Sequence, residues 1–112
     1  MIAKLNRLKR KKDFTKVFKK GKFFKGEGII LNFLQNKRTQ SRFGIVVSQK
    51  ISKKASERNK IKRRIRAAIF EEIPSLKNNF DVVIVATPSI KNESFQTIKK
   101  TINKLFQKAG IT

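Results

Sequence analysis

The stretch from Lys50 to Arg66, KISKKASERNKIKRRIR, constrains the fold of this chain more than any other. Nine of its seventeen residues are Lys or Arg, and Glu57 is the one acidic residue among them. Apolar residues nevertheless recur in and just after it at helical spacing, which predicts a helix with one buried side. The residues of this apolar stripe are Ile61, Ile65, Ala68 and Ile69.

A second face of the same predicted helix is basic. Asn59, Lys62, Arg63 and Arg66 stand at positions i, i+3, i+4 and i+7, so they share one side of the helix. Like charges at this spacing repel, and each pair destabilises an isolated helix by about 0.3 kcal/mol. Such a ridge indicates an anionic partner. The alternative interpretation is an ordinary solvated helix face.

The composition indicates one folded domain with a strong positive field. The chain has 112 residues, 29 of them basic and 7 acidic, with a net charge of +22. Its hydrophobic fraction of 38% is higher than in a disordered basic tail. Nucleic acid is therefore the first partner to consider, and an anionic membrane surface the second. A membrane-spanning helix is not expected, because no apolar run reaches the roughly 18 residues needed.

The side chains offer little covalent chemistry. The chain contains no histidine, cysteine or tyrosine, which removes the usual general base, the commonest metal ligand and the Ser-His-Asp and Cys-His arrangements. Glu71 and Glu72 are adjacent, so on a helix they point about 100° apart. We expect no catalytic residue, and no cofactor or metal bound by protein side chains. A magnesium site made of carboxylates alone is the remaining alternative.

The hydrophobic pattern predicts a single-domain α+β sandwich with one sheet, in the order α-β-β-β-α-β-α. Residues 1–10 are expected to form a flexible basic arm. The predicted helices span residues 11–20, 56–73 and 94–109, and the predicted strands span residues 23–25, 28–35, 42–49 and 80–87.

Particular residues are expected to bound or pair these elements. Gly21 would cap the first helix, Ser56 would cap the second, and Pro74 would end it. The strands at 28–35 and 42–49 have a short polar link and are predicted to form an antiparallel hairpin. The nearly continuous apolar run from Phe80 to Thr87 predicts a central strand covered on both faces.

Phe14 and Phe18 lie at i and i+4 on the first predicted helix. Two phenylalanines at this spacing are more often core residues than stacking platforms for bases, although both roles can occur on a helix at the edge of an open sheet.

Three stretches of the chain together resemble the protein subunit of bacterial ribonuclease P. The first runs from Asn6-Arg7-Leu8-Lys9 through Asp13-Phe14 and Val17-Phe18 to Gly21. The second is Arg42-Phe43-Gly44-Ile45-Val46-Val47-Ser48, followed by Lys50. The third is Lys54-Ala55, Arg58-Asn59-Lys60-Ile61-Lys62-Arg63 and Arg66.

The resemblance implies a cytoplasmic ribonucleoprotein that removes the 5′ leader of precursor tRNA. Its RNA subunit performs the hydrolysis with Mg²⁺, and neither a membrane nor a small-molecule substrate is involved. The implied fold has a four-stranded mixed sheet with a left-handed βαβ crossover. This crossover is an exception, since the general rule gives the opposite hand.

The resemblance also assigns residues to two RNA surfaces. Those that would face the catalytic RNA are Arg58, Asn59, Lys60, Lys62, Arg63 and Arg66. Those assigned to the leader, in a cleft between the first helix and the sheet, are Phe14, Phe18, Asn32, Lys50, Lys53 and Lys54. Asn32 stands where the family often has an aromatic residue, and Phe33 is expected on the other face of the strand.

Three other functions fit the charge less well. A ribosomal or other structural RNA-binding protein often carries its charge on long tails, whereas here it lies on a packed helix. A DNA-compacting protein would bind duplex DNA and structured RNA equally at matched salt. A self-sufficient protein nuclease is disfavoured by the lack of histidine and by the scattered acids.

Overall fold

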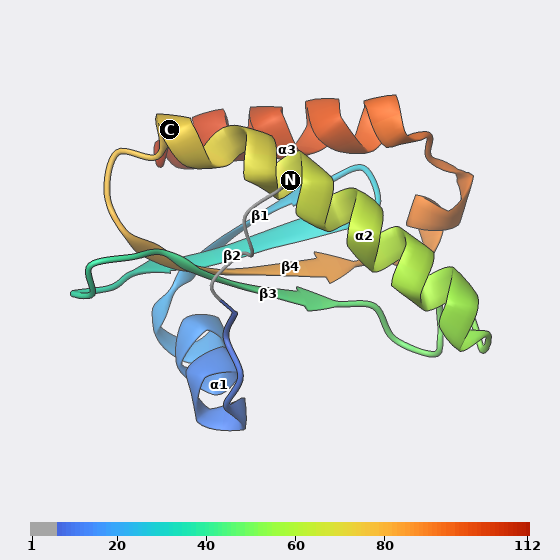
Figure 1. Cartoon of the computed structure of the whole chain (residues 1–112), viewed down its shortest axis with the longest axis horizontal. Coiled ribbons are helices and arrows are strands. Elements are labelled where there is room, and N and C mark those ends of the chain that lie inside the picture. Colours follow the sequence, from blue (N-terminus) through green and yellow to red (C-terminus); the bar gives the residue numbers. More distant parts are fainter. Residues whose placement is uncertain (1–6) are drawn as a thin grey trace.

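The computed structural model describes residues 7–112, which form one four-stranded sheet between two helical layers (Figure 1). The strands are β1 (Lys22–Gly26), β2 (Ile29–Gln35), β3 (Arg42–Val46) and β4 (Phe80–Ala86). The helices are α1 (Lys11–Lys20), α2 (Ala55–Glu72) and α3 (Phe95–Ala109), with short 3-10 turns η1 (Ile73–Ser75) and η2 (Pro88–Asn92). This is the predicted order of elements.

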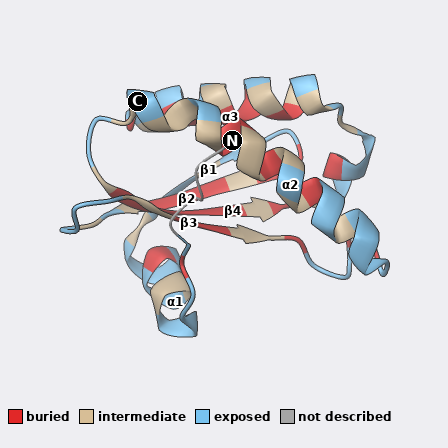
Figure 2. Ribbon diagram, viewed as in Figure 1, coloured by how far each residue is buried: buried red, intermediate tan, exposed pale blue. Residues whose placement is uncertain are grey.

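Strand β4 lies at the centre of the sheet and is buried on both faces. The strand order is β1-β2-β4-β3, with β4 antiparallel to β2 and parallel to β3. Val82 and Ile84 pack in the core under α2 and α3, while Val83 packs with the residues beneath α1. Figure 2 shows buried residues along the sheet and on the helix sides that face it. The prediction of a central strand covered on both faces is confirmed.

The predicted hairpin between β2 and β3 is wrong, because β4 lies between these two strands. Crossing one strand requires about 10 Å in the sheet plane. The six residues between Gln35 and Arg42 can reach about 20 Å, so the connection is long enough to cross β4. The hairpin of this fold joins β1 to β2 instead. Gly28 sits in its turn at φ +71, where an added Cβ would meet Ile90 backbone atoms at 2.9–3.0 Å.

The chain leaves β3, returns through α2 and re-enters the sheet as β4, parallel to β3 (Figure 1). This is the βαβ unit that the resemblance implies, with α2 above the sheet and a left-handed crossover. Within residues 7–112, no helix is long and apolar enough to cross a bilayer.

The ends of the helices follow the sequence only in part. Helix α3 begins after Ser94, which accepts a hydrogen bond from the Thr97 N–H at 3.2 Å, and it ends at Gly110, which caps it at φ 75. Ser56 lies inside α2, which begins after Lys54, so its predicted capping role is wrong. Gly21 does follow α1, but at φ −83, and its small size serves a close approach, since a Cβ would lie 2.3 Å from the Phe33 carbonyl oxygen.

The N-terminal segment before α1 runs along β3. Residues 1–6 lie outside the described residues, so the predicted arm is described only in part. Leu8 is buried, and its N–H donates to the Phe43 carbonyl at 3.0 Å, while Arg7 forms a parallel bridge with Phe43. Arg7 and Leu8 are therefore attached to the sheet edge, while the flexible arm over residues 1–10 stays a prediction.

An ion pair between the half-buried Arg42 and the buried Asp81 joins the starts of β3 and β4. Arg42 donates to Asp81 through Nε at 2.9 Å and Nη2 at 2.6 Å, and Asn36 donates to the same carboxylate at 2.8 Å. Burial alone would raise the pKa of Asp81, but the hydrogen bonds from Arg42 and Asn36 and the Arg42 charge hold that pKa below its usual value. Arg42 also reaches Asp13 of α1 at 3.5 Å, so the pair links the sheet to this helix.

We predict that Asp81→Asn lowers the unfolding free energy by about 3 kcal/mol at pH 7, because it removes one partner of a buried pair. The folded-state pKa of Asp81 is depressed. Its carboxylate therefore contributes to the unfolding free energy above about pH 4, and this contribution is lost as the pH falls through the folded-state pKa. The variant's deficit in urea unfolding should therefore shrink on acidification. Glu71→Gln, which breaks an exposed pair with Lys99, should cost less than about 1 kcal/mol. Equal losses for the two variants would contradict this assignment.

Candidate nucleic-acid interface

Helix α2 presents the predicted basic ridge to solvent. Its apolar stripe is buried against the sheet and α3, with Ile65 and Ile69 fully buried. Asn59 and Arg63 are exposed, and Lys62 and Arg66 are half-buried. The ridge therefore has a rigid apolar backing, which holds the cations at fixed spacing along one side of the helix. Phe70 follows on the same side and packs half-buried against the core.

Two residues assigned to this surface lie apart from the ridge. Arg58 donates through Nη1 to the Ser52 carbonyl at 2.8 Å, so part of its guanidinium is used inside the protein. Lys60 lines a hollow with Arg64 and Lys91, between α2 and η2. The structure thus groups Asn59, Lys62, Arg63 and Arg66 together and sets Lys60 on another side of the helix.

The turn before α2 carries three exposed cations, Lys50, Lys53 and Lys54. Its shape is held by Ser52, whose hydroxyl donates to the Glu57 carboxylate and accepts from the Lys54 N–H. The hydrogen bond from Ser52 and the positive charges nearby lower the pKa of Glu57. The carboxylate is therefore a structural acceptor that shapes the basic turn.

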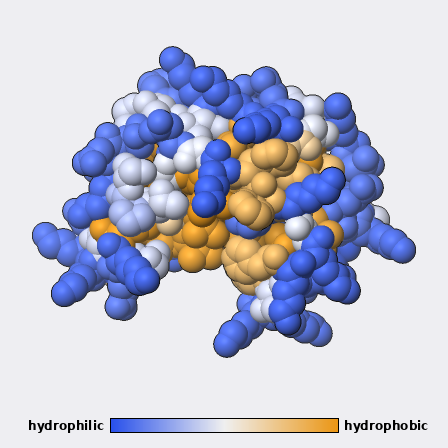
Figure 3. Space-filling view, turned by 180° about the vertical axis from the view of Figure 1, so that it is seen from behind, coloured by the Kyte–Doolittle hydropathy of each residue, from blue (hydrophilic) through white to orange (hydrophobic). Residues whose placement is uncertain are grey.

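The opposite surface of the sheet is only partly covered, by α1. Phe14 packs on Gly44, Val17 is buried, and Phe18 is 49% exposed. Figure 3 shows hydrophobic residues at the surface between projecting hydrophilic side chains. In Figure 1, α1 lies below one end of the sheet and the turn before α2 lies at the other end. We call the hollowed sheet surface between them, which carries Asn32 and Phe23 and is bordered by Phe14 and Phe18, the α1 groove (Figure 3).

The floor of the α1 groove comes from alternate residues of the strands. Asn32 lies in it but is only 8% exposed, with its amide nitrogen 3.3 Å from the Val83 carbonyl oxygen. Phe33 packs on the other side of the sheet in the main core, as expected from strand alternation. Phe23 is directly opposite Asn32 in β1 and is 60% exposed. The sequence pattern does not indicate this exposure, because the register of β1 cannot be read from the sequence.

A basic hollow of about 590 Å³ lies at the start of α1. Most of its lining comes from the segment before α1 and from α1 itself, and the fold adds Arg38 of the β2–β3 connection and Arg42 of β3. The lining residues are Arg7, Lys9, Arg10, Lys12, Asp13, Lys16, Arg38 and Arg42. It adds an anion-attracting surface beside α1.

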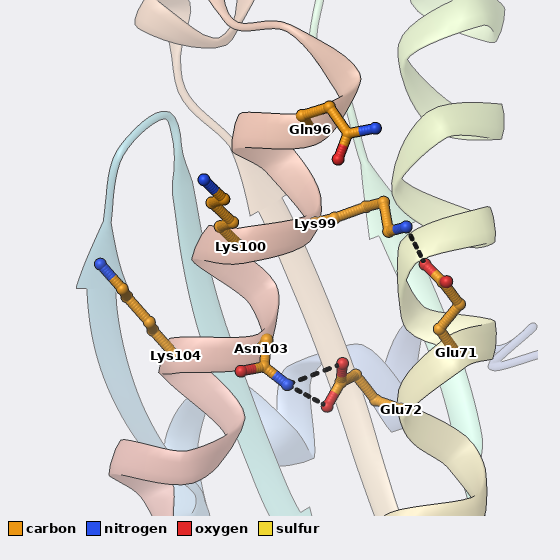
Figure 4. A pocket seen from close by; sticks show the side chains of 7 residues that line it. All are labelled: Glu71, Glu72, Gln96, Lys99, Lys100, Asn103 and Lys104. Atoms are coloured by element: carbon orange, nitrogen blue, oxygen red, sulfur yellow. Dashed lines mark hydrogen bonds and ion pairs between the residues drawn. The ribbon is translucent and has the colours of Figure 1, made fainter.

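The hollow between α2 and α3 is different in character, because two of its lining residues are carboxylates, Glu71 and Glu72, and both have partners on α3 (Figure 4). Lys99 binds Glu71 at 3.1 Å, and the Asn103 amide donates to both carboxylate oxygens of Glu72 at 3.1 Å. These contacts join the two helices. Within residues 7–112, no group of three or more His, Cys, Asp or Glu is placed to hold a metal ion.

The contact between Phe14 and Gly44 positions α1 over the sheet, and it can be tested. A Cβ at Gly44 would lie 2.5 and 2.6 Å from atoms of the Phe14 ring. We predict that Gly44→Ala costs about 1 kcal/mol in urea unfolding, at the lower end of overpacking effects because the half-buried ring can swing outward. In a Phe14→Ala background, the same change should be neutral or stabilising, since Ala restricts the unfolded chain more than Gly. Additive effects in this double-mutant cycle would contradict the contact.

Comparison with known proteins agrees with this geometry. The family described as Ribonuclease P matches residues 2–110. The ribonuclease P protein component of Synechocystis sp. is 40% identical over 111 residues, covering 98% of this chain and 90% of the relative. That of Clostridioides difficile is 38% identical over 106 residues, covering 94% and 92%.

Solved structures agree as well. The Staphylococcus aureus RNase P protein superposes with a TM-score of 0.85 at 29% identity, covering 96% of this chain and 98% of that one. The Thermotoga maritima RNase P protein gives 0.79 at 31% identity, covering 91% and 96%. The fold, the basic helix and the sequence relationship together show that this chain belongs to the bacterial ribonuclease P protein family.

Proposed function

We propose that the chain assists the removal of the 5′ leader from precursor tRNA by binding two RNAs on separate surfaces. The ridge of α2 binds the catalytic RNA subunit through Asn59, Lys62, Arg63 and Arg66. The α1 groove holds the single-stranded leader, with Phe14 and Phe18 on one side. The observation that carries the proposal is the presence of both surfaces on one rigid fold of this family.

The chemistry of the two surfaces differs in the way the proposal requires. Arg and Lys at fixed helical spacing suit the regularly spaced phosphates of a folded RNA. Exposed aromatic rings beside cations suit unstacked bases of a single strand. The turn with Lys50, Lys53 and Lys54 leads from the end of the sheet into α2, so it supplies positive charge to the end of the groove away from α1.

Hydrolysis is assigned to the RNA subunit and its Mg²⁺. The chain has no histidine, cysteine or tyrosine to act near neutral pH. Three of its carboxylates are already engaged, Asp81 by Arg42, Glu71 by Lys99 and Glu72 by Asn103. Because no group of three or more acidic side chains within residues 7–112 is placed to hold a metal ion, we assign to the protein side chains the binding and orientation of RNA. A cytoplasmic location belongs to the same proposal.

The two surfaces can be separated by mutation. We predict that Lys62→Ala with Arg66→Ala weakens assembly with the catalytic RNA, whatever the substrate. If the native protein neutralises about six phosphates, a plot of the logarithm of its RNA-binding constant against the logarithm of the salt concentration has a slope near −5. Each lost phosphate contact lowers that slope by roughly one unit. The matched control is Lys100→Ala with Lys104→Ala, which removes the same charge at the same spacing from exposed positions of α3.

Phe18→Ala should leave assembly intact and weaken precursor tRNA binding by about 1–3 kcal/mol, the cost of losing one base stack. Mature tRNA, which has no leader, should bind with unchanged affinity. Because Phe18 is half exposed, its loss should cost far less stability than the roughly 3–5 kcal/mol of a core phenylalanine such as Phe106. Equal weakening of precursor and mature tRNA, or unfolding of the variant, would overturn the leader assignment.

A further inference from the structure

Two aromatic rings are exposed on the same surface of the protein. Among residues 7–112, the large hydrophobic side chains that are exposed are Phe18 at 49% and Phe23 at 60%. Phe23 of β1 pairs directly with Asn32 of β2, so the two side chains point to the same face of the sheet. That face is the one covered in part by α1. Phe18 lies one turn after Phe14, which packs on Gly44 of this face, so both exposed rings within residues 7–112 border the α1 groove.

The fold itself gives no account of the Phe23 ring. Its neighbour Phe24 points to the opposite face and stacks on Phe33, with ring centroids 6.2 Å apart and planes 9° apart. Phe23 instead stands in solvent on an edge strand, where exposed apolar side chains invite aggregation and charged residues are usual. An exposed ring at this position is better explained by a ligand than by packing.

The surroundings of Phe23 indicate the chemistry of that ligand. Lys25 stands two residues further along β1 and is exposed on the same face. Asn32, across the strand pair, is almost fully buried and offers the groove little surface. A ring beside a mobile cation fits one nucleotide, with the base on the ring and the phosphate near the ammonium.

We propose that Phe23 is a second aromatic platform of the α1 groove, on which a base of the single-stranded 5′ leader stacks. The inference rests on the proposed function and adds a residue that determines how tightly the leader is held. Phe18 and Phe23 come from α1 and β1, so they contact different leader nucleotides. The ring that β2 lacks at Asn32 is supplied from β1.

A second copy of the chain is the competing occupant, because β1 is an edge strand. Charge argues against it. The chain carries +22, and β1 has Lys22 and Lys25 at its edge, which is how edge strands are kept from pairing. A polyanion gains from the same charges that two copies would have to bring together.

The test uses the enzyme reconstituted from this chain and its RNA subunit, with fluorescent precursor and mature tRNA. Phe23→Ala should weaken precursor tRNA binding roughly 5- to 100-fold, as loss of one stacked base does, and leave mature tRNA binding unchanged. Phe23→Trp should preserve the affinity. The control is Phe95→Ala, which removes a half-buried ring that packs under Lys99 on α3, across the sheet from the groove. It should leave the ratio of precursor to mature affinity unchanged.

Single abasic substitutions along the leader identify the contact. The penalty of Phe23→Ala should disappear with an abasic nucleotide at one leader position, and that of Phe18→Ala at a different one. If the penalty of Phe23→Ala persists at every position, the ring does not stack on a base and the inference is wrong. The inference is also overturned if Phe23→Ala leaves precursor tRNA binding unchanged. This includes the case in which sedimentation shows that the substitution abolishes self-association of the protein and nothing else.

Failure of the proposed function would look different. In that case the wild-type enzyme itself would bind precursor and mature tRNA equally. If the wild-type enzyme binds precursor tRNA more tightly than mature tRNA, and the Phe23→Ala variant does so by the same factor, only the role of Phe23 is rejected.

Discussion

Burial of β4 on both faces is the constraint on which the rest of the structure depends. The strand lies between β2 and β3, and its side chains pack alternately toward α1 and toward α2 and α3. Its apolar sequence can be buried only if helices cover both sides. Helix α2 thereby gains an apolar support for a basic ridge that would repel itself in isolation. On the other face α1 covers only one end, which leaves the α1 groove open.

Positive charge is then divided between surfaces with different shapes. On α2 the cations stand at fixed spacing over a packed core, while other cations lie in the basic turn before α2 and in the hollow beside α1. The acids are placed where they serve the fold: Asp81 holds Arg42, Glu57 accepts from Ser52, and Glu71 and Glu72 join α2 to α3. Few carboxylates are left near the two proposed RNA surfaces, so the field there stays positive.

The elements and their order were predictable because their signals are local. Helix α3 has its apolar stripe, Ser94 and Gly110 within one segment, and β4 is one unbroken apolar run. Strand pairing was not predictable, because the place of β4 between β2 and β3 depends on which strand gains most from burial. The candidate nucleic-acid interface was likewise predictable only where its signal is local. The ridge of α2 follows from helical spacing, but the exposure of Phe23 depends on the β1–β2 register, and the basic hollow beside α1 joins residues from separate segments. The contact of Arg58 with Ser52 likewise depends on the turn before α2.

The central claim is that this chain supplies binding while the RNA subunit supplies the chemistry. The most direct measurement is the rate of leader removal from precursor tRNA by the catalytic RNA across a range of Mg²⁺ concentrations, with and without the protein. The account predicts that the protein alone cleaves nothing. It also predicts that the protein lowers the Mg²⁺ concentration that the RNA needs for cleavage. The Lys and Arg side chains of the protein offset the repulsion between the phosphates of the RNA subunit and those of its substrate. Cleavage by the protein alone, or an unchanged Mg²⁺ dependence, would contradict it.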